Sequence, residues 1–221
     1  VSELGVIFAS TDRSRGARGL SAFIVPMNTP GITVGKKENK MGHRASNTVE
    51  LYFDDVHVPA KNIIRKEGYG FIVAMKTLDY ARPAVGAGGI GVARAAYEEA
   101  LKYSQTRIQF GKPISQFQIN AFKLADMAIE IDAARLMVHR SAWMLDNSLK
   151  ASKESAMAKV LATDVAMRVT TEAVQIMGGY GYMKEYPVEK MMRDAKLLQI
   201  YEGTNEIQRH VISLEILGTS K

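Results

Sequence analysis

The carboxylate of Glu202 lies in the segment Tyr201-Glu202-Gly203-Thr204-Asn205-Glu206, between two stretches with helical periodicity. Thr204 can cap the last helix, which places Glu206 in its first turn. Glu202 precedes that cap, beside a tyrosine and a glycine that lets another molecule approach closely. A carboxylate in this place can act as a general base, or it can complement the positive end of the helix. The residues alone leave both interpretations open.

A second candidate is the segment 107–113, Arg-Ile-Gln-Phe-Gly-Lys-Pro, which joins two long stretches of helical periodicity. The Arg107 guanidinium could bind a phosphate by charge-assisted hydrogen bonds, and the Phe110 ring could stack on a planar group. An ordinary polar loop between helices is an equally good interpretation of the same residues.

Two weaker motifs fall in the first helical stretch. Arg82 follows Asp79 by three residues, so it either binds a ligand or pairs with Asp79, and the pair is favoured. Pro83 is predicted to kink or interrupt this helix. The run Gly86–Gly91 matches GxGxxG, but no strand precedes it, so close packing of helices is favoured over dinucleotide binding.

The elements that must position these residues change character along the chain. Residues 1–66 hold short β-forming runs separated by turns, which predicts part of an antiparallel barrel with too few strands to close. From residue 67 the period becomes about 3.6, which predicts an antiparallel bundle of long helices over residues 67–221. Trp143 is expected in its core. We expect an upstream segment to supply the remaining barrel strands.

Composition excludes several classes of protein. The chain of 221 residues has no cysteine, and its four histidines are far apart, so neither a disulfide framework nor a metal site is expected. The net charge of +6 is dispersed, which argues against nucleic-acid binding. No run approaches the length of a membrane span, and the residues at the start of the sequence do not lead us to expect a signal peptide.

These segments occur together in an order that resembles the acyl-CoA dehydrogenase family of flavoproteins. The resemblance covers essentially the whole chain, and its joint pattern is far more specific than any one piece. The matching stretches are residues 19–25, 41–46, 53–59, 107–113, 175–181, 193–196 and 201–209. The family fold is an N-terminal helical domain, a middle β-barrel and a C-terminal four-helix bundle. The resemblance therefore implies the later barrel strands followed by the bundle.

The family reaction is the α,β-dehydrogenation of an acyl-CoA thioester to the trans-2-enoyl-CoA. A carboxylate removes the α-proton, and a hydride passes from the β-carbon to FAD N5. The resemblance implies that Glu202 is this base, with its own backbone N–H as one donor to the thioester oxygen. Some relatives carry the base at the position that matches Ala81, which cannot serve here.

The resemblance also assigns contacts to FAD and to the substrate. Implied FAD contacts are Arg107, Gln109, Phe110, Phe117, Gln118, Gln175, Gly178, Gly179, Thr204 and Glu206. Glu206 is the least secure of these, because an acid beside a pyrophosphate is unfavourable. Implied substrate contacts are Asp79, Tyr80, Arg82, Tyr201 and Gly203.

The resemblance further implies partners and a compartment. In the family the loop at Arg107 reaches the FAD of a neighbouring subunit, so a homo-oligomer, a dimer of dimers, is expected. An electron-transfer flavoprotein is the expected electron acceptor, and the bacterial cytoplasm is favoured over the mitochondrial matrix. The alternatives are an acyl-CoA oxidase-like enzyme, a non-catalytic relative such as the DNA-associated branch, or a fragment that serves only in oligomerisation.

Overall fold

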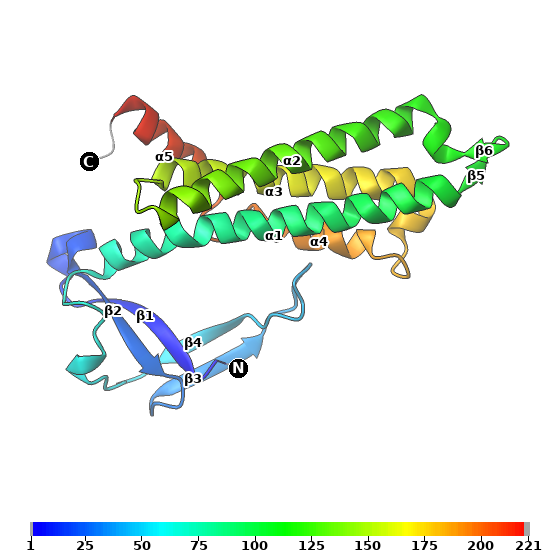
Figure 1. Ribbon diagram of the computed structural model, residues 1–221. Helices are drawn as coiled ribbons and strands as arrows, with labels where there is room; N and C mark the ends of the chain where they lie inside the picture. The colour runs from blue at the N-terminus through cyan, green and yellow to red at the C-terminus, as the bar shows by residue number, and fades with distance from the viewer. Residues whose placement is uncertain (1, 219–221) are drawn as a thin grey trace. The chain divides into compact units, whose positions relative to one another are not determined.

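The computed structural model describes residues 2–218, which divide into two compact units. The first unit runs to Lys40 and continues over Arg44–Leu78, and the second contains Met41–His43 and the chain from Asp79 onward. Antiparallel strands fill the first unit and long helices the second, which confirms the predicted fold class (Figure 1). The domain division after residue 66 stays a prediction.

The first unit contains two antiparallel pairs of strands. Strand β1 (Leu4–Ser10) pairs with β2 (Leu20–Pro26), and β3 (Ile32–Lys37) pairs with β4 (Val49–Phe53). Leu4, Val6 and Phe8 alternate along β1 with half-buried neighbours, yet all three are exposed. A two-stranded sheet is only marginally stable alone. An exposed apolar face of this kind is typical of strands that pack against other parts of a larger sheet or barrel.

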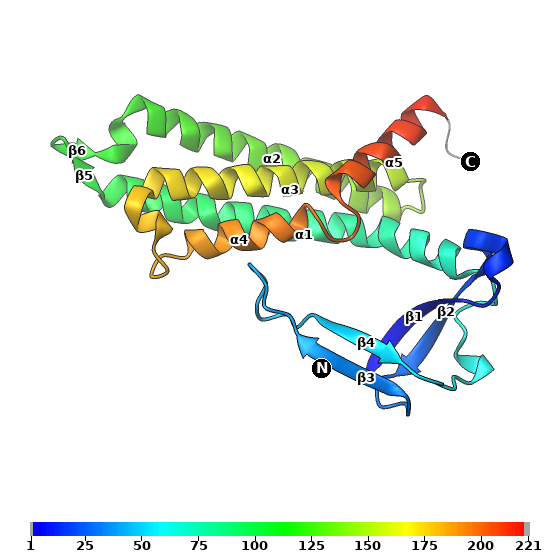
Figure 2. The same ribbon diagram turned by 180° about the vertical axis from the view of Figure 1, so that it is seen from behind.

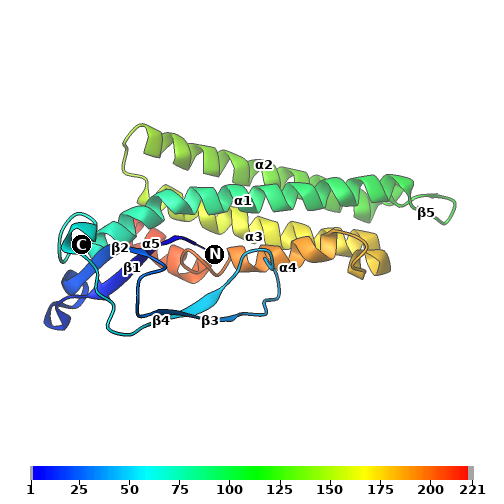
Figure 3. The same ribbon diagram turned by 90° about the horizontal axis from the view of Figure 1, so that it is seen from below.

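Within residues 2–218, five α-helices make up most of the second unit, and the first of them begins in the first unit. Figures 1, 2 and 3 show these helices. They are α1 (Gly70–Thr106), α2 (Gln118–Asp146), α3 (Ser152–Met177), α4 (Val188–Leu198) and α5 (Asn205–Leu217). A small hairpin of β5 (Ile108–Gln109) and β6 (Lys112–Pro113) connects α1 to α2. Within the described residues, no helix combines the length and the apolarity that a membrane span needs.

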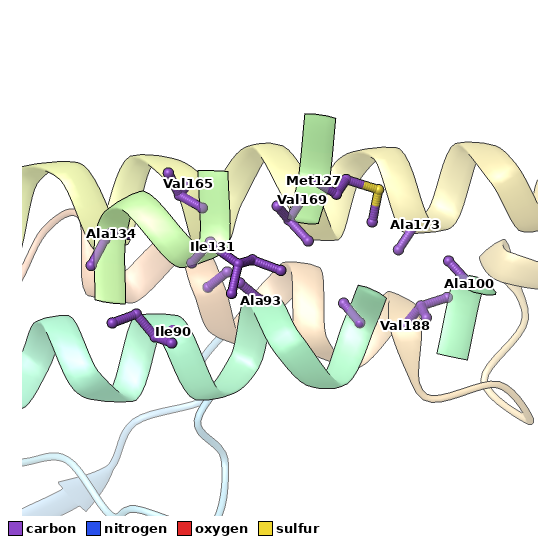
Figure 4. Packing of buried hydrophobic residues seen from close by; sticks show 14 of the residues in the cluster. Ile90, Ala93, Ala100, Met127, Ile131, Ala134, Val165, Val169, Ala173 and Val188 are labelled. Carbon is purple, nitrogen blue, oxygen red and sulfur yellow. The ribbon is translucent and has the colours of Figure 1, made fainter. Parts of the chain in front are cut away.

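Small side chains let the helices of the bundle pack closely. Figure 4 shows residues of α1, α2 and α3 interdigitating in the core, with Ile131 and Val169 among alanines such as Ala93. A Cβ atom at Gly86 would lie 2.9 Å from Val138 Cγ2, and one at Gly89 would lie 3.0 Å from the Ala162 carbonyl oxygen. The GxGxxG run therefore serves helix packing, as the sequence favoured.

Two predictions about the helices differ in outcome. The helix α1 is not interrupted at Pro83 but continues to Thr106, so the predicted interruption is absent while the predicted kink stays a prediction. Proline removes one backbone hydrogen bond, and the buried contacts of Ile90, Ala93, Ala96 and Ala100 hold the following turns in place. Trp143, expected in the core, is 60% exposed on α2, because the buried face of that helix passes through Val138 and Ser141 instead.

Candidate active site

Glu202 lies between α4 and α5 in the chain. Figure 2 shows the short turn that joins these two helices lying beside α3. Glu202 and Gly203 both have positive φ values, 55° and 88°, in the left-handed region that non-glycine residues rarely adopt. The Asn205 N–H donates to the Gln199 carbonyl at 3.0 Å, which closes the turn. Thr204 caps α5 by accepting from the Ile207 N–H at 3.3 Å, as predicted.

Two buried side chains hold the carbonyl groups of this turn. Gln208 Nε2 donates to the carbonyl oxygens of both Glu202 and Gly203, each at 3.1 Å. Lys159 Nζ donates to the same Gly203 oxygen at 2.9 Å. Gln208 and Lys159 have no exposed surface. The turn is therefore built into the bundle and is not a loose surface loop.

Asn205 connects this turn to helix α3. Its Oδ1 accepts from Lys159 Nζ at 2.8 Å, and its Nδ2 donates to Asp164 Oδ1 at 2.7 Å. Partial burial opposes ionisation of Asp164, but hydrogen bonds from Arg209, Gln199 and Asn205 outweigh it and hold its pKa below the usual value.

Arg82 brings a buried cation to the same region from α1. Its side chain is 5% exposed, and its NH1 donates to Asp79 Oδ1 at 2.6 Å, so the predicted pair with Asp79 is present. Burial lowers the pKa of Arg82, while the charges of Asp79 and Glu202 raise it. The buried Nε–H has no acceptor within residues 2–218. An unsatisfied buried donor of this kind points to an acceptor that a ligand supplies.

The remaining predicted substrate contacts are split between two places. Tyr201 adjoins Glu202, and burial, followed by the Glu202 charge, raises the pKa of its hydroxyl. Its ring lies 6.3 Å from that of His43, centroid to centroid. Tyr80 instead lines a separate pocket of about 330 Å³ between α1 and α2, so it lies apart from the Glu202 turn.

A second site lies at the β5–β6 end of the bundle. A surface pocket of about 840 Å³ brings together most of the predicted cofactor contacts, while Gln118, the first residue of α2, lies outside its lining. The contacts that line it are Arg107, Gln109, Phe110, Phe117, Gln175, Gly178 and Gly179.

The chemistry of this pocket suits a phosphate-bearing cofactor with a planar ring. The Arg107 guanidinium lies 5.7 Å from the centre of the Tyr180 ring, while Phe110 is 92% exposed and meets Phe117 edge-on. Nothing lies within 4 Å of a Cβ built on Gly178 or Gly179, so the backbone there is open to a ligand. Thr204 and Glu206, also predicted cofactor contacts, lie at the start of α5 instead.

Sequence reasoning missed Lys159, Asn205 and Gln208, the buried residues that hold the Glu202 turn. One signal for Lys159 was available. It falls at a position where the helical period of α3, through Ala162, Thr163 and Ala166, requires a buried residue. A lysine on an otherwise small and apolar face is unusual and marks a buried hydrogen-bonding role.

The pH dependence of stability tests the buried state of Lys159. Burial lowers the pKa of Lys159 from 10.5 to about 8. Between these values the unfolded chain binds more protons than the folded one, so the stability contributed by Lys159 rises with pH. The free energy of unfolding of the unmodified protein, minus that of Lys159→Met, should increase by about 2 kcal/mol between about pH 7 and about pH 10.

Urea denaturation at the two pH values measures this difference. The control is Lys123→Met, which removes a part-exposed lysine paired with Glu172 and reports the effect of a lysine-to-methionine exchange as such. A difference for Lys159→Met that stays the same at both pH values would show that the ammonium is not buried as described.

Known proteins with similar sequences and structures define the family. Residues 68–217 match the acyl-CoA dehydrogenase C-terminal domain, and residues 1–56 match the acyl-CoA dehydrogenase middle domain. The short-chain specific acyl-CoA dehydrogenase of Megasphaera elsdenii is 54% identical over 94% of this chain and 54% of its own length. The chain thus spans about half the length of this relative.

Solved structures agree with the sequence comparison. The butyryl-CoA dehydrogenase of Megasphaera elsdenii superposes with a TM-score of 0.96 at 52% identity, covering 98% of this chain and 56% of its own. A chain from a structure of the electron transferring flavoprotein of Acidaminococcus fermentans also gives a TM-score of 0.96, at 50% identity over 98% of this chain and 57% of its own. With both domain matches and this degree of identity, the chain belongs to the acyl-CoA dehydrogenase family.

Proposed function

We propose that the protein containing this chain catalyses the FAD-dependent α,β-dehydrogenation of an acyl-CoA thioester to the trans-2-enoyl-CoA, with Glu202 as the base. The observation that supports this most is the fixed turn that presents Glu202. Its two carbonyl groups are held by buried side chains, and the buried Arg82 lies close enough for the charge of Glu202 to act on it. A general base needs this kind of fixed placement relative to the proton that it removes.

Two groups of the turn act on the substrate, the Glu202 carboxylate and the Glu202 backbone N–H. Glu202 takes the α-proton on a carboxylate oxygen and holds it as the neutral acid. The backbone N–H of Glu202 has no backbone or side-chain acceptor within residues 2–218, so it is available to the thioester oxygen. A donor at that oxygen stabilises the negative charge that develops as the α-proton leaves. When bound, FAD supplies the acceptor for the hydrogen and the electron pair that leave the β-carbon.

Butyryl-CoA is the first substrate to test. The similar proteins from Megasphaera elsdenii are a short-chain specific acyl-CoA dehydrogenase and a butyryl-CoA dehydrogenase. We propose a short acyl chain for this protein on that basis. Anaerobic addition of butyryl-CoA to the FAD-loaded protein should bleach the flavin absorption. Rapid return of the colour on admission of oxygen would favour an oxidase, and no bleaching by any acyl-CoA would reject the proposal.

FAD is proposed to bind at the Arg107 pocket through its phosphates. Because the guanidinium would donate charge-assisted hydrogen bonds to the pyrophosphate, Arg107→Ala should cost about 1.5–3 kcal/mol of binding free energy. The dissociation constant for FAD should rise about 10- to 100-fold, while the rate of flavin reduction in fully loaded protein changes little. Fluorescence titration of the apoprotein with FAD measures this constant.

The control for Arg107 is Arg94→Ala on α1, the helix that ends just before Arg107. Arg94 lies on the exposed surface of α1 and pairs with Glu98, outside the pocket. Its replacement should leave FAD binding unchanged. Equal FAD affinities of Arg107→Ala and the unmodified protein would contradict the assignment of Arg107.

Two features of the bundle support a homo-oligomer, proposed as a dimer of dimers. Arg82 lies on α1 and Arg107 directly follows its end, about 37 Å further along, since each helical residue adds about 1.5 Å. We propose on this basis that the two sites of one chain belong to separate active centres. The exposed face of α2 carries Phe122, Ile129, Leu136 and Trp143 at seven-residue spacing. A heptad stripe of this kind is typical of a helix that packs on another copy. Sedimentation of the holoenzyme should show a tetramer, and a monomer would contradict it.

The electron acceptor and the compartment are proposed on the basis of the similar proteins. We propose an electron-transfer flavoprotein as acceptor, supported by the similar chain in the structure of the Acidaminococcus fermentans flavoprotein. The bacterial cytoplasm is the proposed compartment, because the relatives described above come from bacteria. The division into a partial barrel over residues 1–66 and a bundle over residues 67–221 is part of the same proposal.

A further inference from the structure

Lys159 lies beneath the Glu202 turn with no exposed surface. Lysine is almost never fully buried unless it is paired. Its Nζ donates to the Gly203 carbonyl oxygen at 2.9 Å and to Asn205 Oδ1 at 2.8 Å. Both acceptors are neutral oxygens, and both lie in the short segment that follows Glu202. The ammonium is thus bound to the turn that presents the proposed base.

Packing alone does not account for a lysine at this position. Its neighbours on the buried face of α3, Ser155, Ala162, Thr163 and Ala166, are small and have no exposed surface. Methionine has nearly the same length and would fill this space without bringing a charge into the core. Burying an ammonium costs far more than burying an apolar side chain of equal size. The lysine at this position is therefore explained by its charge and its N–H groups and not by its size.

The conformation of the turn indicates the role of the Lys159 ammonium. Glu202 has a φ of 55°, and a non-glycine residue keeps such a value only when its surroundings impose it. Gln208 bonds both carbonyl groups of the turn from α5. Lys159 bonds the second of them from α3 and also reaches Asn205. Lys159 is therefore the residue of α3 that binds a backbone carbonyl of the turn directly, while Asp164 and Thr163 of the same helix bind Asn205.

The charges around Lys159 come from several elements. Asp164 lies on the same helix, Glu206 on α5 and Arg82 on α1, and Glu202 lies on the turn itself. The charges of the proposed base and of the acidic start of α5 thus both act on the ammonium. Removing it would change both the hydrogen bonds that fix the turn and the balance of charge beside Glu202.

We propose that Lys159 is a positioning residue for the Glu202 carboxylate, which it fixes through the Gly203 carbonyl and Asn205. This inference rests on the proposed function, and Lys159 itself, being fully buried, contacts the turn and not the substrate. A misplacement of about 1 Å at a reacting group lowers the rate about 100-fold. Loss of the ammonium should therefore slow proton removal and leave the affinity for acyl-CoA nearly unchanged.

A matched pair of side chains at position 159 tests this. The chain has no cysteine, so Lys159→Cys introduces a single thiol into it. Alkylation of the unfolded variant with 2-bromoethylamine restores an ammonium at the length of lysine, while 1-bromopropane gives an apolar side chain of equal length. Both products, and the unmodified protein as a control, are refolded with FAD in the same way. Flavin reduction by butyryl-CoA is then followed by rapid anaerobic mixing, and enoyl-CoA affinity by spectral titration.

The aminoethyl product should reduce its flavin within about tenfold of the unmodified protein, and the propyl product about 100-fold more slowly. Both should bind enoyl-CoA within about threefold of the unmodified protein. Equal reduction rates in the two products would overturn the inference. The inference would also be overturned if the propyl product lost FAD or enoyl-CoA binding. Lys159 would then stabilise the fold as a whole and not the Glu202 turn in particular. Absence of flavin reduction in the unmodified protein would instead reject the proposed function on which the inference rests.

Discussion

Glu202→Gln is expected to lower the rate of flavin reduction by acyl-CoA by at least 10²–10⁴-fold, the usual contribution of a general base. The amide has nearly the same shape as the carboxylate, so the turn should keep its backbone hydrogen bonds. It cannot accept the α-proton, so the chemical step fails while FAD and acyl-CoA still bind. Rapid anaerobic mixing with butyryl-CoA measures the rate, and spectral titration with enoyl-CoA measures binding.

The control for this variant is Glu215→Gln, the same exchange on α5 at a residue that pairs with Lys150. It should reduce its flavin at the normal rate. A second carboxylate offers a stricter check, because Ala81 lies directly before Arg82 on α1. Adding Ala81→Glu to Glu202→Gln should restore part of the activity. Near-normal flavin reduction in Glu202→Gln alone would remove Glu202 as the base.

Gly203→Ala should reduce the rate of flavin reduction about 100-fold, because it displaces the side chain that fixes the turn. A Cβ atom at Gly203 would lie 2.5 Å from Gln208 Nε2, far inside the closest normal contact. Gln208 is fully buried, so it can move aside only by giving up its bonds to the carbonyl oxygens of Glu202 and Gly203. Because Glu202 itself is unchanged, the defect should appear in the reduction rate and not in FAD content.

Gly218→Ala separates this clash from the general cost of alanine at a positive φ. Gly218 has a φ of 67°, and nothing lies within 4 Å of the added Cβ. Both variants should lose about 1 kcal/mol of stability from the left-handed backbone, but only Gly203→Ala should lose activity. Equal activities in the two variants would show that Gln208 does not position the turn.

Periodicity and turn chemistry were sufficient to predict the helices of the bundle and the capping role of Thr204. The last helix, α5, begins directly after Thr204 as predicted, because a hydroxyl at the cap and an apolar stripe after it are local signals. The antiparallel strands of the first unit were also predictable, since β-forming runs separated by turns are local features. All of these depend on residues close together in the sequence.

The sequence could not show which residues meet across the bundle. The bonds from Lys159 to Gly203 and from Asn205 to Asp164 join segments more than 40 residues apart, and no local pattern encodes such pairs. The helix is not interrupted at Pro83 for a related reason, because contacts between helices outweigh the loss of one backbone hydrogen bond. The exposure of Trp143 depends on which face of α2 meets α3, and an apolar residue type does not decide this.

A crystal structure of the oxidised holoenzyme with FAD and bound enoyl-CoA tests the central claim most directly. If Glu202 is the base, one of its carboxylate oxygens should lie about 3–3.5 Å from the α-carbon, the separation of a near-attack geometry. The same structure should show the Glu202 N–H donating to the thioester oxygen and Lys159 Nζ still bonded to the Gly203 carbonyl. A different carboxylate against the α-carbon, with Glu202 turned away from it, would contradict the account.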